Sequence, residues 1–202
     1  MTPLRSIFVR TTGKRHLLTM LSAMALAGPM TVASAQTEQT EGEANRTSPV
    51  VQAVRAATRD YRDVNAAMAA GYVSTGTCAS GPNEGAMGVH YVNEAYLMDG
   101  EIDVDRPEIL VYEPRNGRQQ LVAIEFFVLA EQWDAANEGP PALEGQLFHY
   151  LGEPNRLRLP ANYQLHVWAW KRNSKGTFAD WNPDVSCAQF SGEVTQSQVS
   201  VH

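Results

Sequence analysis

The most apolar run of this chain is Leu121-Val122-Ala123-Ile124-Glu125-Phe126-Phe127-Val128-Leu129. A short run of this kind, rich in β-branched and aromatic residues, is typical of a strand whose two faces are both buried. Its single ionisable side chain is Glu125. A carboxylate buried without partners costs several kcal/mol, so Glu125 must be protonated or held by a cation, an arginine or hydrogen bonds.

Two histidines occur in similar apolar surroundings, His90 beside Val89 and Tyr91, and His166 beside Leu165. In the middle of strands, a rigid scaffold can aim such side chains at a common point. Two imidazoles and one carboxylate suit zinc, iron or copper. We therefore predict a metal site formed by His90, Glu125 and His166, with His149 as a possible fourth ligand. No short motif such as H-E-x-x-H joins these residues, so their convergence is a hypothesis.

Two metal-free interpretations stay open. In the first, Glu125 belongs to a buried polar network that only stabilises the fold, and it pairs with a tyrosine or with one of Arg115, Arg118 and Arg156. In the second, the region is a pocket for a small organic ligand, lined by Tyr91, Trp168, Trp170 and Trp181. Each histidine, taken alone, is more often a core residue than a ligand.

Residues 1–35 have the pattern of a secretory signal peptide. A basic region without acidic residues precedes an apolar stretch, Leu17 to Ala27, that is too short to span a bilayer, and Ala33-Ser34-Ala35 is an A-x-A cleavage site. We expect a periplasmic or secreted protein with no stable membrane insertion after the signal is removed. Residues 36–48 are polar and free of aromatics, which is typical of a disordered leader.

The charge of the chain limits its partners. The full sequence has 16 basic and 22 acidic residues, and the signal contains four of the basic ones and no acidic one. Removal of the signal would therefore leave 12 basic and 22 acidic residues, a net charge of −10. Nucleic acid and anionic lipid both favour positive charge, so we expect neither as a partner. A metal ion or a small molecule is compatible with this balance.

The chain has two cysteines, Cys78 and Cys187. In an exported chain the default interpretation is a disulfide, which would close a loop of about 110 residues and contribute about 4–5 kcal/mol in the chain-entropy model. The alternative, a pair of thiolate metal ligands, has no C-x-x-C spacing to support it.

The pattern of apolar residues predicts an α+β fold in a single domain over 49–190. Ser48-Pro49 is typical of a helix start, and apolar residues at spacings of three and four continue from Val50 to Met68. After a loop predicted over 76–88, several strands follow, with Asn116-Gly117 as a hairpin turn and a final long strand over 163–171. We thus expect an N-terminal amphipathic helix packed on a mainly antiparallel sheet, closed by one disulfide, with a flexible tail over 191–202.

The acidic residues Asp99, Glu101, Asp103 and Asp105 alternate with other residues, which suggests calcium. However, the glycine and the distal glutamate of an EF-hand loop are not in place, because Leu110 stands at the twelfth position. We interpret the segment as a solvated acidic turn.

Several segments resemble an uncharacterised family of exported bacterial proteins: Met87-Gly88-Val89-His90-Tyr91-Val92, Leu110-Val111-Tyr112-Glu113-Pro114, Val122-Ala123-Ile124-Glu125-Phe126-Phe127, Leu165-His166-Val167-Trp168-Ala169-Trp170 and Phe178-Ala179-Asp180-Trp181-Asn182-Pro183. This resemblance implies export and no particular activity. A local similarity to oil-body-associated proteins rests on His90-Tyr91, Val111-Tyr112, Leu121 to Glu125 and a later histidine, and it implies that His90 and Glu125 share a site. Together these observations predict an exported metal-binding domain, with a metal-dependent enzyme of unknown substrate as one form that it could take.

Overall fold

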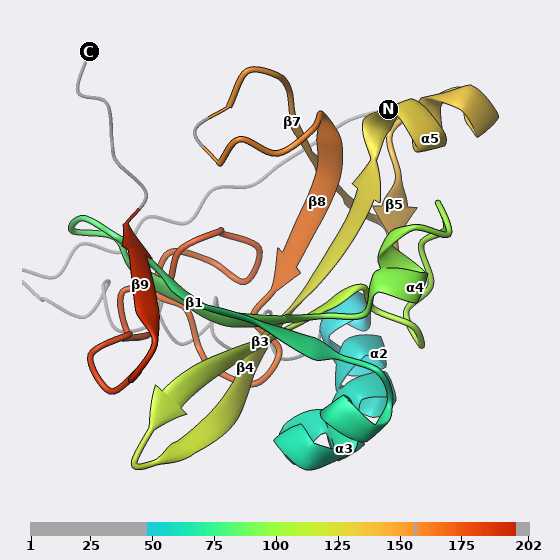
Figure 1. Ribbon diagram of the computed structural model, residues 1–202. Helices are drawn as coiled ribbons and strands as arrows, with labels where there is room; N and C mark the ends of the chain where they lie inside the picture. The colour runs from blue at the N-terminus through green and yellow to red at the C-terminus, as the bar shows by residue number, and fades with distance from the viewer. Residues whose placement is uncertain (1–47, 156, 197–202) are drawn as a thin grey trace, which may run out of the picture.

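The computed structural model describes residues 48–155 and 157–196. They form a curled seven-stranded sheet with short helices against it, in the strand order β7-β8-β4-β3-β2-β1-β9 (Figure 1). All neighbouring strands are antiparallel except β1 and β9. The predicted α+β class is confirmed, as is the mainly antiparallel sheet.

The elements along the chain are the following: α2 (Pro49–Thr58), the 3-10 helix η1 (Arg59–Arg62), α3 (Val64–Ala69), β1 (Val73–Gly81), β2 (Gly85–Val92), α4 (Glu94–Leu97), β3 (Ile109–Arg115), β4 (Arg118–Leu129), α5 (Ala130–Ala136), β5 (Ala142–Leu143), β6 (Gln146–Leu147), β7 (His149–Leu151), β8 (Asn162–Val167) and β9 (Glu193–Gln196). Strands β5 and β6 form a separate two-stranded sheet. No helix of the described residues is long and apolar enough to cross a bilayer.

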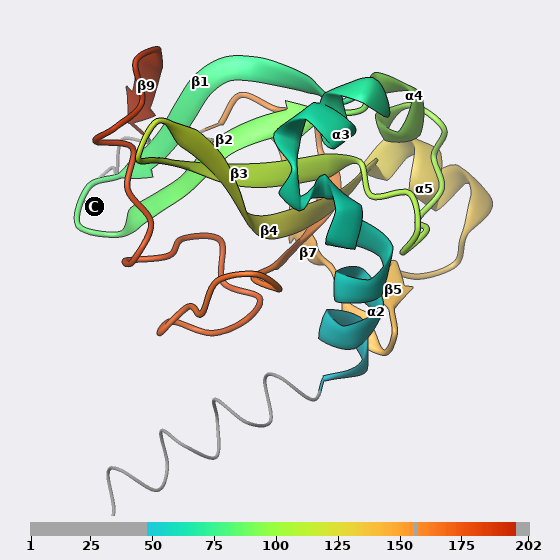
Figure 2. The ribbon, with the colours of Figure 1, turned by 90° about the horizontal axis from the view of Figure 1, so that it is seen from below.

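Helix α2 closes one face of the main sheet (Figure 2). Its valines are buried in one core cluster with Leu110 of β3 and Ile124 of β4, which are paired across the two strands. On the same side, the hydroxyl of Tyr112 donates to the Tyr61 carbonyl at 2.6 Å. Because successive side chains of a strand point to opposite faces, Glu125 points away from α2.

The single helix predicted from Ser48 onward is in fact three short segments. The break lies at Asp63, whose backbone is extended (φ −90°, ψ 112°) and whose side chain accepts the Asn65 N–H at 3.0 Å. Aspartate is a favoured N-cap because its carboxylate satisfies a free N–H of the first turn. The chain therefore starts a new helix here, and Met68 at the end of the predicted apolar stripe is 49 % exposed.

Three strands lie wholly or partly where we predicted irregular structure. The segment 76–88, predicted as a loop, contains most of β1 and the start of β2, and the predicted flexible tail contains β9. Thr77 of β1 pairs with Glu193 of β9. Both strands are rich in small and polar residues, so they have no apolar alternation, and they form because a neighbouring strand offers its backbone groups. Residues 197–202 of the predicted tail lie outside the described residues, as do the predicted signal and residues 36–47.

The segment 168–187, which we call the 168–187 loop, is irregular and fixed to the sheet. The strand predicted to reach Lys171 ends at Val167, because the next backbone N–H, of Trp168, donates to the Thr177 carbonyl at 3.0 Å. Further along, Asn182 and Ala86 of β2 exchange two backbone hydrogen bonds. The Lys171 ammonium also lies 2.7 Å from the carboxylate of Glu113, a buried residue of β3.

The predicted disulfide between Cys78 and Cys187 is confirmed. Cys78 lies in β1, and Cys187 ends the 168–187 loop, with 5.8 Å between the two Cα atoms. The bond therefore ties this loop to the sheet at a sequence separation of 109 residues.

We expect removal of this bond to lower the free energy of unfolding by about 4 kcal/mol. Without the crosslink, the unfolded chain regains the conformational entropy that closure of a very long loop removes. Denaturant unfolding of the oxidised protein, the reduced protein and the Cys78→Ser/Cys187→Ser variant measures the difference. The reduced protein and the double variant should agree with each other. An unchanged unfolding midpoint in both would contradict the expectation.

Candidate metal centre

The antiparallel register of β4 and β8 places Glu125 directly opposite His166. Side chains opposite each other in neighbouring strands share a face and have Cβ atoms about 5 Å apart. The nearest polar atoms of the two residues, Glu125 Oε2 and His166 Nε2, are separated by 3.6 Å. The strand pairing alone therefore brings together two of the three predicted ligands.

His90 reaches the same carboxylate from β2, which is two strands away from β4. It lies opposite Val111 of β3, which in turn lies opposite Ala123, two residues before Glu125 and on its face. His90 Nε2 is 3.4 Å from Glu125 Oε2. The rings of His90 and His166 are perpendicular, with centroids 6.3 Å apart.

His90, Glu125 and His166 form a group that could hold a metal ion, since one ligand atom from each lies within 4.8 Å of the others. Among the described residues this is the single such group. Two ligands that bind a tetrahedral ion at about 2.1 Å lie about 3.4 Å apart. The distances of 3.4 and 3.6 Å from the carboxylate oxygen to the two imidazoles match that spacing.

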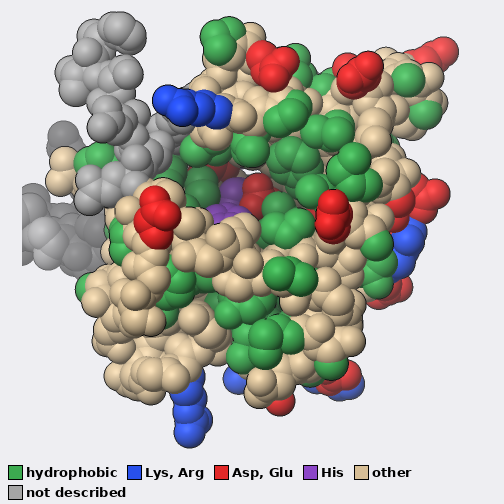
Figure 3. Space-filling model, in the orientation of Figure 1, with side chains coloured by type: hydrophobic (Ala, Val, Ile, Leu, Met, Phe, Trp, Pro, Cys, Tyr) green, Lys and Arg blue, Asp and Glu red, His purple; other side chains and the backbone are tan. Residues whose placement is uncertain are grey.

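The group is deep but not sealed. The His166 side chain is 1 % exposed and that of Glu125 8 %, whereas that of His90 is 17 % exposed. Figure 3 shows a hollow in the surface with histidine and acidic side chains at its floor and hydrophobic side chains around them.

Opposite charges stabilise the group without a metal. Burial would raise the pKa of Glu125, but the charge of His166 and the contact with His90 hold this pKa below its ordinary value. Burial would likewise lower the pKa of His166, yet the charges of Glu125 and Asp180 raise it. Both shifts have the direction expected for a carboxylate beside an imidazolium.

Asp180, which the sequence analysis did not select, lies behind His166. It comes from the 168–187 loop, and its Oδ1 is 3.6 Å from His166 Nδ1. The loop has no helical or strand periodicity that would single out Asp180. The only signal in the sequence is that Asp180 lies in Phe178 to Pro183, one of the segments that resemble the exported bacterial family.

His149, the predicted fourth ligand, stands outside the group of three. On β7 it lies opposite Gln164, on the face that carries His166, but its side chain is 54 % exposed. Its Nδ1 is 3.9 Å from Oδ1 of Asp180, so it contacts the site through this carboxylate.

Each of the four predicted pocket aromatics has a contact of its own in the structure. The Trp168 indole donates to the Ala179 carbonyl, the Trp170 indole donates to Thr58 of α2, and Trp181 lies against Gly81 of β1. Tyr91 packs edge-on against Tyr112, on the α2 face of the sheet. A ligand pocket lined by these residues stays a prediction.

Two of the three arginines considered as partners of Glu125 lie away from it. Arg115 and Arg118 pair with each other at the exposed end of the β3–β4 hairpin, next to the predicted turn at Asn116-Gly117. Arg156 lies outside the described residues.

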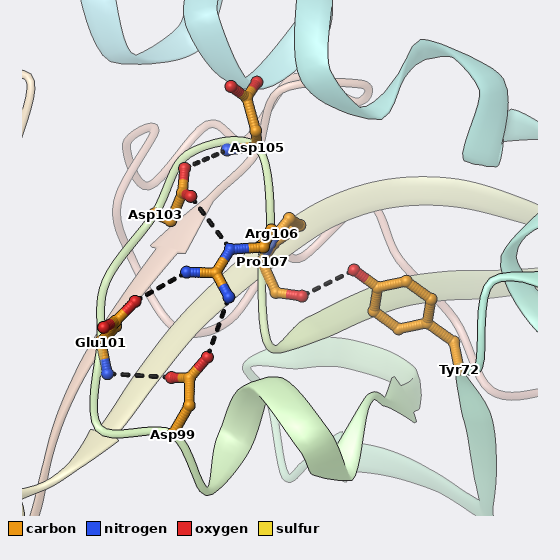
Figure 4. A network of polar contacts seen from close by, with 7 residues as sticks. All are labelled: Tyr72, Asp99, Glu101, Asp103, Asp105, Arg106 and Pro107. Carbon is orange, nitrogen blue, oxygen red and sulfur yellow. Dashed lines mark hydrogen bonds and ion pairs between the residues drawn. The ribbon is translucent and has the colours of Figure 1, made fainter.

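The acidic segment around residue 100 is held together by one arginine of its own. The Arg106 guanidinium donates to Asp103 at 3.0 Å, Asp99 at 3.2 Å and Glu101 at 2.8 Å (Figure 4). The Tyr72 hydroxyl donates to the Pro107 carbonyl next to it. Three of the four carboxylates therefore share one arginine.

Another buried carboxyl, that of Glu108, follows this segment. Glu108 is 1 % exposed, and its carboxylate accepts a hydrogen bond from the Phe127 N–H at 3.0 Å. Phe127 lies in β4, two residues past the last residue that pairs with β3. Burial raises the pKa of Glu108 to about 8, although the hydrogen bond from Phe127 lowers it in part. The burial of Glu108 is not evident from the sequence, because the residue stands at a strand boundary.

No family model, curated protein or solved structure matches this chain. The function therefore has to be inferred from the side chains of the centre itself.

We expect Glu108→Gln to stabilise the protein at neutral pH. Because the folded state holds the proton of Glu108 up to about pH 8 and the unfolded state only to its ordinary 4.5, wild-type stability falls between these values by about 1.4 kcal/mol per pH unit. Glutamine keeps an oxygen for the Phe127 N–H and does not ionise. The gain, measured by denaturant unfolding, should grow with pH over this interval, and a gain independent of pH would contradict the raised pKa.

We expect the interaction between Glu125 and His166 to stabilise the metal-free protein most between pH 4.5 and 6.5. The contribution of Glu125 is complete above its ordinary pKa of 4.5 and is lost as pH falls through its lowered folded value. That of His166 is complete below 6.5 and is lost as pH rises through its raised folded value.

Thermal unfolding in EDTA, compared between wild type and Glu125→Gln at each pH, measures this contribution. Besides the pair itself, His90 and Asp180 face these two residues and remain in both proteins. A difference between the two proteins that stays constant on both sides of the interval would show that the pair carries no such charge.

Proposed function

We propose that this protein is an exported metal-binding protein in which His90, Glu125 and His166 hold one divalent transition-metal ion. The observation that carries the proposal is the shared approach of two imidazole nitrogens to one buried carboxylate oxygen, at 3.4 and 3.6 Å. These distances suit ligands of one ion, and they are longer than ordinary hydrogen bonds. Nε2 of His166, the nitrogen that faces Glu125, is moreover buried without a hydrogen-bond partner among the described residues.

The ligand types favour zinc, iron or copper. Imidazole suits these three metals, whereas magnesium and calcium favour sites made entirely of oxygen. Three protein ligands also leave at least one coordination position for water or a substrate, as in catalytic zinc and non-haem iron sites. The partial exposure of His90 and the hollow in Figure 3 support an approach from that side.

An ion held in this way would activate bound water or dioxygen, which is the chemistry of a metal-dependent enzyme. The disulfide supports the exported location, since disulfides persist in oxidising compartments.

A second candidate is a metal-free polar network that stabilises the fold. The specific observation in its favour is the mutual charge compensation of Glu125 and His166, which shifts both pKa values in the directions expected for an ion pair. In this case the imidazoles are only the counter-charges of a buried carboxylate.

The decisive experiment measures the metal content of protein purified from the exported fraction without chelator. We expect about one ion per chain and at least a 100-fold loss of affinity in His166→Ala, because a ligand is removed. His149→Ala is the matched control, since it removes a nearby histidine outside the group of three, and it should keep the metal. Elemental analysis and competition with a chromophoric chelator give both quantities.

Normal metal content in His166→Ala, or no binding of zinc, iron or copper to the wild type, would overturn the proposal. Glu125→Leu then tests the second candidate. If the network only compensates a buried charge, leucine should keep or raise the stability measured in EDTA, since an apolar residue needs no counter-charge.

A further inference from the structure

The buried ring of His166 has an acidic side chain at each nitrogen. Nε2 lies 3.6 Å from Glu125 Oε2, and Nδ1 lies 3.6 Å from Asp180 Oδ1. A neutral imidazole has one N–H and one lone pair, and the partner of one nitrogen decides which nitrogen keeps the lone pair. A metal bound by the group of three needs the lone pair at Nε2, so the proton has to stay at Nδ1.

The backbone around Asp180 holds its carboxylate in place. On one side the Trp168 indole donates to the Ala179 carbonyl at 2.6 Å. On the other, the buried side chain of Asn173 donates to the Trp181 carbonyl at 2.9 Å. The backbone carbonyl groups of both neighbours of Asp180 thus accept hydrogen bonds from other side chains. The 168–187 loop that contains these residues is also fixed to β2.

We propose that Asp180 is the positioning residue of this centre. Its Oδ1, 3.6 Å from His166 Nδ1, would accept the Nδ1–H in the metal-bound centre, which fixes the ring orientation and the tautomer and leaves the Nε2 lone pair for the ion. A carboxylate behind a metal-bound histidine also makes the imidazole a stronger ligand. This inference rests on the proposed function, and it adds a residue from a loop to a centre otherwise formed by three strands.

His149 shares this carboxylate from the solvent side. Its Nδ1 is 3.9 Å from the oxygen that faces His166, and it is the most exposed of these side chains. We assign it no part in positioning, because the buried nitrogen of His166 is closer to that oxygen. His149→Ala is therefore the matched control for changes at position 180.

The first test reads the tautomer of His166 in the metal-free protein by ¹⁵N NMR, at a pH where the ring is neutral. In wild type and in His149→Ala a substantial fraction of the protons should be at Nδ1, because Asp180 and Glu125 lie 3.6 Å from the two ring nitrogens. In Asp180→Ala the proton should move largely to Nε2, since Glu125 is then the only acidic side chain beside the ring. A purely structural role of Asp180 would not move this signal. An unchanged tautomer in Asp180→Ala would overturn the proposal.

The second test measures zinc affinity by competition with a chelator. Loss of a carboxylate behind a metal-bound histidine typically weakens binding 10- to 100-fold. We expect a loss in this range for Asp180→Ala, a smaller one for Asp180→Asn, whose amide oxygen can still accept the N–H, and less than a threefold change for His149→Ala. Asp180→Asn, nearly the same shape as wild type, serves alone if the alanine variant does not fold.

The two readouts separate this inference from the proposed function. If the wild type binds no metal, the proposed function fails, and with it the role of Asp180 in metal binding, even where the tautomer shows that Asp180 orients His166. If the wild type binds zinc and the Asp180 variants bind it equally well, only the inference about Asp180 fails.

Discussion

The pairing of β4 with β8 is the constraint on which this centre depends. It places Glu125, a charge inside the most apolar strand, opposite His166, and a shift of one residue would turn one of them to the other face. The residues on either side of Glu125 point into the core beneath α2, so the register is specified by their burial. The hydrophobic core thus determines where the polar group stands.

From this pair, acidic and basic groups alternate toward the surface. Glu125 contacts two imidazoles, His166 contacts Asp180, and Asp180 contacts the exposed His149. Burial alone would favour the neutral forms of Glu125 and His166. The neighbour of opposite charge reverses the shift of each pKa and favours the charged form. The same arrangement suits a metal ion and a buried ion pair. In the first case the ion, held also by the neutral imidazoles, balances the carboxylate, and in the second an imidazolium does.

Sequence reasoning succeeded where a few neighbouring residues decide the structure. Asn116-Gly117 forms the predicted turn with positive φ at both residues (52° and 70°), since those residue types tolerate this conformation. It failed where a distant partner decides. β1 has too few apolar residues to be recognised and forms against β2 and β9, and Asp63 divides a helix whose apolar stripe predicted continuity.

By itself, the sequence determined that Glu125 needs a partner and that Cys78 can pair only with Cys187. Burial of a charge and a count of two cysteines are enough for both conclusions. Only the tertiary structure decided that the partners are His90 and His166, with Asp180 behind them, and not the arginines of the hairpin. The physical reason is that strand order and register come from packing between segments tens of residues apart, which no local periodicity records.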